Sequence, residues 1–153
     1  MVRTLAVVFL LVIPLWFFGQ ASPKDSKHIR PVDPTETYRD FHAALGGPAP
    51  ATPAGWTPNV QDYEGEVFRV GYVKGEHYME WQGSTGTDWV YDASGKGKQV
   101  GTELVAGATW QKWQDAAGHT SLVRTFGKVT ELVGGLREKA SDAELVSLAE
   151  TVR

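Results

Sequence analysis

A continuous apolar run opens the chain and a polar stretch follows it. Leu5 to Phe18 (LAVVFLLVIPLWFF) contains no charged residue and is preceded by Arg3, whereas residues 22–34 are rich in lysine, aspartate and proline. The run of fourteen residues matches the core of a signal peptide and is shorter than the ~20 residues that a membrane-spanning helix needs. The pattern therefore predicts a segment that carries the chain out of the cytoplasm.

Two fates are open for residues 1–21, a transmembrane anchor or a cleaved signal peptide. Gly19 and Ala21 give the small-x-small pattern of a signal peptidase site. However, residues 16–18 (WFF) resemble an interfacial aromatic belt, and the span becomes long enough if Arg3 snorkels to the head groups. We favour the uncleaved anchor, with secretion after cleavage as the alternative.

The charges that flank the apolar run are nearly balanced. Arg3 and the amino terminus lie before it, and Lys24, Lys27 and Arg30 lie after it. Translocation of a charged amino terminus is the rarer route. We therefore expect a single-pass protein of the cell membrane with its carboxyl-terminal domain outside.

The next part of the chain predicts a linker and then a helix. Residues 22–34 are polar and contain three prolines, which is typical of a spacer. Asp33 is placed to cap a helix, whose apolar positions Tyr38, Phe41 and Leu45 recur at helical spacing until Gly46. Residues 48–58 contain four prolines and predict an irregular loop.

Beyond Asn59 the apolar period changes to two residues, which predicts strands. Two alternating segments flank residues 74–76 and predict a hairpin with one apolar face. The remaining segments are predicted as a loop (83–87), a short strand (89–91), a loop (94–98), a strand (100–105), and a meander of three strands (110–114, 121–126 and 129–133) with turns at Gly118 and at residues 127–128.

The end of the chain predicts a short helix. Ser141 and Glu144 have the spacing of a capping box, and four apolar residues follow on one face: Leu145, Leu148, Ala149 and Val152. The fold class is therefore α+β, with an amino-terminal membrane helix followed by one domain (35–153). This domain has an antiparallel sheet of about five to seven strands and helices at both ends.

Composition excludes several classes of function. The chain has no cysteine, so disulfides, thiolate metal sites, a cysteine nucleophile and a lipid-modified cysteine are excluded. The net charge is −3 and charges of both signs are interspersed, which argues against a nucleic-acid binder.

No motif predicts a cofactor, a metal site or a catalytic residue. The four histidines are far apart in sequence, so no helical metal-binding pair exists. Asp62, Glu64 and Glu66 share one face of a strand, but they lack the glycine and the distal glutamate of a calcium loop. We interpret them as a solvated edge face.

Four aromatic residues are the candidates for a binding surface: Trp89, Tyr91, Trp110 and Trp113. Trp110 and Trp113 are three apart, so on a regular strand they point to opposite faces and at most one faces the main core. In one interpretation the other packs beneath a helix or the 48–58 loop. In the other it forms, with Tyr91 or Trp89, a stacking platform for an envelope sugar or a partner protein.

The order of these signals resembles a known family. The features that carry the resemblance are an amino-terminal membrane segment followed by short motifs at 30–33 (RPVD), 53–56 (PAGW), 70–72 (VGY), 110–111 (WQ), 122–124 (LVR), and in the last helix at 144–149. Together they resemble the membrane-anchored domain of unknown function 4245 family of high-GC Gram-positive bacteria. Glu131 departs from the valine-rich strand expected there. The resemblance implies a tethered extracytoplasmic domain and supplies no activity.

The sequence thus favours a non-enzymatic binding or accessory protein of the cell envelope, whose partner is an envelope protein or a glycan. One alternative is an envelope hydrolase that uses carboxylates such as Asp88 or Asp92, which requires two acidic groups that converge in a cleft. The other alternative is a structural partner of another membrane protein.

Overall fold

The computed structural model describes residues 30–135 and 139–152. Three helices lie in these ranges: α2 (Thr35–Leu45), α3 (Val90–Ala93) and α4 (Asp142–Ala149). The strands are β1 (Thr57–Glu64), β2 (Val67–Lys74), β3 (His77–Thr85), β4 (Lys98–Val105), β5 (Ala108–Gln114), β6 (Thr120–Phe126) and β7 (Val129–Gly134).

The predicted membrane anchor and signal peptidase site fall in residues 1–29, outside the described residues. The anchor and its topology therefore stay predictions. Within residues 30–135 and 139–152, none of the helices combines the length and the apolar character that crossing a bilayer requires.

The seven strands found in the described residues form one antiparallel sheet, with the order β1-β2-β3-β7-β6-β5-β4. Strands that follow each other in sequence pair directly, except β3 and β4, which are connected through α3. This gives one meander of β1 to β3 and another of β4 to β7. The two meanders join where β3 pairs with β7, from Glu80 opposite Gly134 to Thr85 opposite Val129. The predicted α+β domain is confirmed, with seven strands.

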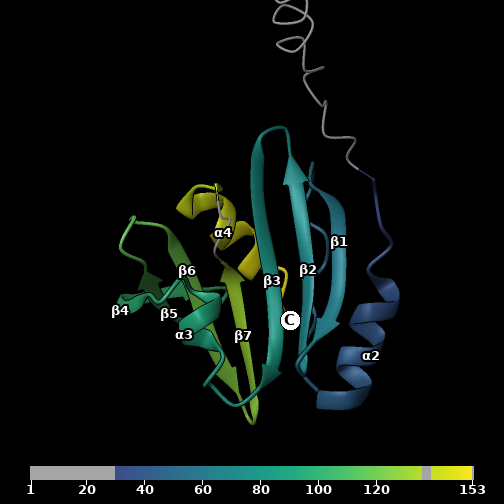
Figure 1. Ribbon diagram of the computed structural model, residues 1–153, viewed down its shortest axis with the longest axis horizontal. Coiled ribbons are helices and arrows are strands. Elements are labelled where there is room, and N and C mark those ends of the chain that lie inside the picture. The colour runs from purple at the N-terminus through teal and green to yellow at the C-terminus, as the bar shows by residue number, and fades with distance from the viewer. Residues whose placement is uncertain (1–29, 136–138, 153) are drawn as a thin grey trace, which may run out of the picture.

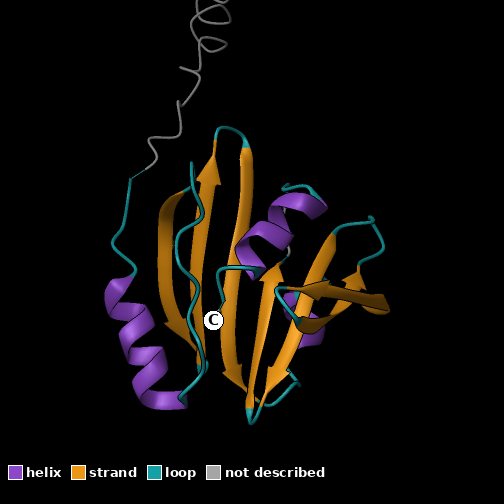
Figure 2. Cartoon of the chain, turned by 180° about the vertical axis from the view of Figure 1, so that it is seen from behind, coloured by secondary structure: helices purple, strands orange, loops and turns teal. Residues whose placement is uncertain are grey.

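The helices cover the two faces of the sheet unequally (Figures 1 and 2). Figure 2 shows α2, α4 and the loop after α2 on one face, whereas α3 lies on the opposite face. The main core lies under α2 and α4, and its largest fully buried side chains include Trp81, Trp110, Tyr72, Phe41 and Met79. We call this side the core face and the side under α3 the back face.

The last helix, α4, follows its predicted start signal, whereas α2 begins at Thr35 with Pro34 as its N-cap, which makes no side-chain cap bond. Asp33 Oδ1 accepts the backbone N–H of Thr35 at 3.0 Å, at the start of α2. In α4 the capping box is complete, because Ser141 Oγ accepts from the backbone N–H of Glu144 and the Glu144 carboxylate accepts from the backbone N–H of Ser141. Since neither helix is long enough to be stable alone, each depends on packing against the core face.

Phe41 shows how α2 is anchored. Its side chain is fully buried, and its ring lies edge-on to the rings of Phe68 and Trp81, with centroids 5.5 and 4.8 Å apart. Trp56 is also buried in this core. Trp56 therefore attaches the 48–58 loop to the core.

Residues 89–91 are not the predicted strand but the start of α3. The backbone N–H groups of Val90, Ala93 and Ser94 donate to the carbonyls of Thr87, Trp89 and Val90, at 2.8 to 3.1 Å. Three residues are too few to separate a period of two from a helical turn. The burial of Val90 against the back face decides in favour of the turn.

Several strand boundaries also differ from the prediction, most clearly in β3 and β1. β3 continues to Thr85, through residues predicted as a loop, because Gly83 lies between two strands, opposite Phe68 and Glu131. β1 begins at Thr57, inside the stretch predicted as irregular. Pro58 is tolerated there because β1 is an edge strand, and the register shifts next to it.

Candidate binding groove around Arg124

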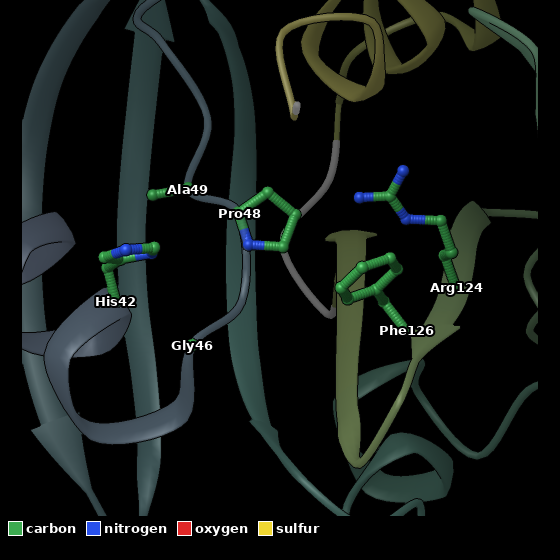
Figure 3. A pocket seen from close by; sticks show the side chains of 6 residues that line it. All are labelled: His42, Gly46, Pro48, Ala49, Arg124 and Phe126. Atoms are coloured by element: carbon green, nitrogen blue, oxygen red, sulfur yellow. The ribbon is translucent and has the colours of Figure 1, made fainter.

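A groove opens on the core face between the end of α2 and the end of β6 (Figure 3). Its volume is about 380 Å³, within the size range of small-ligand sites. One wall is formed by α2 and the loop after it, and the other by β6. Six residues line it: His42, Gly46, Pro48, Ala49, Arg124 and Phe126.

The first wall is held close to the sheet by the turn that ends α2. Gly46 has a φ of +71° and donates its backbone N–H to His42 at 2.8 Å. A Cβ on the next residue, Gly47, would lie 2.9 Å from the Phe41 ring, closer than side-chain packing tolerates. The absence of side chains here lets the loop pass directly over the core and face β6.

Arg124 is fixed from below by two contacts. Its Nη2 donates to Glu131 Oε2 at 2.7 Å, and its guanidinium carbon lies 4.7 Å from the ring centroid of Trp110. The side chain of Arg124 is 14% exposed and that of Glu131 is 0% exposed. The structure thus holds a cation in one position at the base of the groove.

Burial dominates the electrostatics of this pair. Desolvation raises the pKa of Glu131, while the Arg124 guanidinium and the nearby Trp81 indole oppose the rise. Glu131 Oε1 and Arg124 Nε form no hydrogen bond within the described residues. Because an arginine stays charged and part of the Arg124 side chain is exposed, the groove keeps a cation at its base.

The mouth of the groove is apolar. Phe126 is 60% exposed, and Figure 3 shows Pro48 on the wall across from Arg124 and Phe126. A fixed guanidinium orients a carboxylate or carbonyl oxygen, and the aromatic ring beside it offers a surface for an apolar segment. This arrangement suits binding of a ligand that combines both features.

The structure separates the four predicted aromatic residues. Trp110 is fully buried on the core face beneath Arg124. Trp89 and Trp113 are partly buried on the back face, where both pack against the cluster of Val90, Val123 and Leu132. Tyr91 is exposed on α3. Thus Trp89 and Trp113 come together, and Trp110 lies apart from them.

Arg124, Phe126 and Glu131 were not predicted as site residues, although the sequence carries a signal for Arg124 and Glu131. The predicted turn at residues 127–128 already places Arg124 opposite Glu131, as the structure confirms. An acidic residue at an inward position of a strand, with arginine as its cross-strand neighbour, indicates a buried ion pair. Glu131 was considered only as a departure from a family pattern.

The other candidate groups are paired or exposed. His77 Nδ1 lies 2.9 Å from Glu144 Oε2, and His119 Nδ1 lies 2.8 Å from Asp115 Oδ2. Across residues 30–135 and 139–152, no three side chains of the types that bind metals cluster together. Asp62, Glu64 and Glu66 are exposed, as are Asp88 and Asp92.

A second buried carboxyl group lies on the back face. Glu80 accepts from the Tyr78 hydroxyl at 2.9 Å and from Gln82 Nε2 at 2.5 Å, and burial raises its pKa. Glu131 on β7 lies opposite Gly83 of β3. Gly83 and Glu80 are three residues apart on β3, so Glu80 projects from the face of the sheet opposite to Glu131. The two buried carboxyl groups therefore do not converge in one cleft.

Comparison with known protein families gives a match over nearly the whole chain. Residues 1–152 match a family described as protein of unknown function, DUF4245. No curated protein and no solved structure matches the chain. The family match covers the apolar amino terminus, the groove and both terminal helices of the domain. The chain therefore belongs to the DUF4245 family.

Proposed function

We propose that this chain is a binding protein of the cell envelope, tethered to the membrane by its amino-terminal segment and active outside the cytoplasm. The apolar run at residues 5–18 and the polar spacer at 22–34 support the tether. A fusion of alkaline phosphatase after residue 153 tests the topology, because this enzyme is active only outside the cytoplasm. An active fusion supports the proposal, and an inactive one contradicts it.

The groove around Arg124 is the binding site in this proposal. One observation carries it: a guanidinium fixed by Glu131 and Trp110 opens into a groove whose other lining is mainly apolar. The ligand class that fits is an apolar segment with a carboxylate at its end. The carboxylate meets Arg124, and the apolar segment lies against Phe126 and Pro48.

Two probes of equal size test this site, 3-phenylpropanoate and 3-phenylpropan-1-ol. Both carry the apolar segment and only the first carries the carboxylate. In NMR titrations of the full chain in lipid nanodiscs, we expect about tenfold tighter binding of the carboxylate, because it adds a charge-assisted hydrogen bond. Equal affinities for the two probes contradict the assigned ligand class.

Two variants assign the preference to Arg124. The double variant Arg124→Met with Glu131→Leu removes both charges and leaves neither partner unpaired; we expect it to bind both probes equally. Phe126→Ala removes the exposed ring, and we expect it to weaken both probes by a similar factor while the preference for the carboxylate remains. If the double variant still prefers 3-phenylpropanoate to 3-phenylpropan-1-ol, the carboxylate of the probe does not bind at Arg124.

A second candidate is a glycan platform on the back face. Trp89 and Trp113 pack against the same cluster there, and Tyr91 is exposed on the adjoining helix. Aromatic side chains at a surface stack on sugar rings. Titration with soluble fragments of the envelope glycan tests this, because binding would shift the emission of Trp89 and Trp113. No specific observation favours the hydrolase alternative.

A further inference from the structure

The two edges of the sheet are protected to different degrees. At the β1 edge, Val32 donates its backbone N–H to Pro58 at 2.9 Å, and the Thr37 hydroxyl of α2 donates to Gln61 at 3.3 Å. At the β4 edge, which lies at the other end of the sheet from α2 in Figure 1, no described residue outside the β4–β5 ladder hydrogen-bonds to residues 98–105. β4 therefore presents a row of free backbone donors and acceptors.

β4 is also long, exposed and partly apolar. Every residue of Lys98–Val105 except Val105 is exposed, and the exposed fractions of Val100 and Leu104 are 57% and 72%. Proteins usually shield such an edge with a covering segment, proline, charged side chains or a bulge. β4 has charged residues and a register shift next to Val100, but no described segment covers it. The free backbone groups of an edge strand are complementary to one kind of partner, another extended strand.

The side chains of β4 carry a charge pattern that identifies the partner strand. Lys98 lies opposite Gln114, and Glu103 lies opposite Trp110. Gln114 and Trp110 are four residues apart on β5, so they share a face, and Lys98 and Glu103 share that face as well. This is consistent with the register shift in β4, where Val100 is an extra residue.

We infer that β4 pairs antiparallel with β4 of a second copy of this chain, around a two-fold axis at Gly101. This register keeps, on the free edge, the bulge that Val100 forms in the β4–β5 pairing, so Val100 takes no partner. Lys98 and Glu103 then each lie two paired positions from Gly101, one before it and one after it. Self-pairing therefore places Lys98 of each copy opposite Glu103 of the other, which forms two cross-strand pairs of opposite charge. The two sheets become one continuous sheet. This inference is independent of the proposed ligand groove.

The lack of cysteine gives a direct test with the full chain in membranes. A Cβ on Gly101 would meet no other atom within 4 Å, so Gly101→Cys is compatible with the fold. Paired residues on neighbouring strands have Cα atoms about 4.5 to 5.5 Å apart, within the range of a disulfide. Under mild oxidation we expect Gly101→Cys to give a covalent dimer. Glu64→Cys on the β1 edge is the matched control and should give little dimer.

Charge exchange tests the register. Lys98→Glu in the Gly101→Cys background places glutamates opposite each other twice, and we expect the dimer yield to fall about tenfold. Adding Glu103→Lys restores both pairs and should restore the yield. Intrinsic tryptophan emission of each variant, compared with that of the parent chain, verifies the fold. The inference is overturned if Gly101→Cys gives no more dimer than Glu64→Cys, if charge exchange has no effect, or if the cysteine introduced by Gly101→Cys links to a different protein.

Discussion

Arg124 and Glu131 face each other across the β6–β7 hairpin, joined by a 2.7 Å hydrogen bond between Nη2 and Oε2. Glu131 is fully buried, so removal of one partner leaves the other without compensation. We expect Glu131→Leu alone to lower the free energy of unfolding by about 3 kcal/mol, measured by urea denaturation. The double variant Arg124→Met with Glu131→Leu should lie within about 1.5 kcal/mol of the parent, since similar volumes are kept.

The double-mutant cycle decides whether the two side chains act as a pair. A coupling energy near zero, with the double variant as unstable as the sum of the two single variants, would contradict this view of the pair.

Gly71 leaves room for Tyr78, and this contact gives a second prediction. A Cβ at Gly71 would lie 2.6 Å from the Tyr78 hydroxyl, which donates to the buried Glu80. Gly71→Ala should therefore displace Tyr78 and lower the free energy of unfolding by about 1–3 kcal/mol. Gly101→Ala is the control, because its Cβ meets nothing within 4 Å, and its effect should stay within about 0.5 kcal/mol. Equal effects of the two substitutions would show that Gly71 has no special packing role.

The pH dependence of stability should have an acid limb set by Glu144. The backbone N–H of Ser141 and the His77 ring lower the pKa of Glu144 from 4.5 to about 2. A lowered pKa in the folded state adds stability above the unfolded value, and this contribution is lost as the pH falls from 4.5 towards 2. Glu144→Gln should flatten this limb in denaturation curves measured from about pH 2 to about pH 5. An acid limb unchanged by Glu144→Gln would contradict the assignment.

Glu80 should produce the opposite trend at higher pH. Burial raises its pKa above 4.5, so the folded state retains a proton that the unfolded state releases. Stability from this group is fully present below pH 4.5 and declines as the pH rises through the folded pKa. Glu131 contributes with the same sign. We expect Glu80→Gln to reduce the decline in the free energy of unfolding above pH 4.5. A steeper decline in this variant would contradict the raised pKa of Glu80.

Acrylamide quenching should divide the tryptophans into two classes. Trp56, Trp81 and Trp110 are buried, whereas Trp89 and Trp113 are partly exposed. In a Trp16→Phe background, which removes the tryptophan outside the described residues, we expect curved quenching plots with an accessible fraction. Changing Trp89 and Trp113 to phenylalanine should remove this fraction. Uniformly low quenching in the Trp16→Phe variant, which still contains Trp89 and Trp113, would contradict an exposed aromatic platform on the back face.

Local patterns in the sequence predicted most of the fold. The capping box at Ser141, the stop at Gly46 and the alternation in β2 and β3 depend on neighbouring residues, so they can be read along the chain. Residues 89–91 could not be assigned in this way, because burial of Val90 against distant strands selects the helical turn. The pairing of β3 with β7, which joins the two meanders, is likewise set by tertiary packing.

The site was less predictable than the fold. The sequence pointed to tryptophans as surface candidates, but it could not tell which tryptophan faces the core, and Trp110 proved to be the one beneath Arg124. The groove itself forms between α2 and β6, which are about eighty residues apart in sequence. Of the site, only the Arg124–Glu131 pair could be predicted from the sequence, because the predicted hairpin turn places the two residues opposite each other.

The most direct test of the proposed binding site is an NMR titration of the full chain in lipid nanodiscs with 3-phenylpropanoate, observing the Arg124 Nε–H and the Phe126 ring. We predict saturable shifts at both groups, together with contacts between the two phenyl rings. Saturable shifts confined to Trp89, Tyr91 and Trp113, or none at any concentration of the probe, would contradict the assignment of the groove as the binding site.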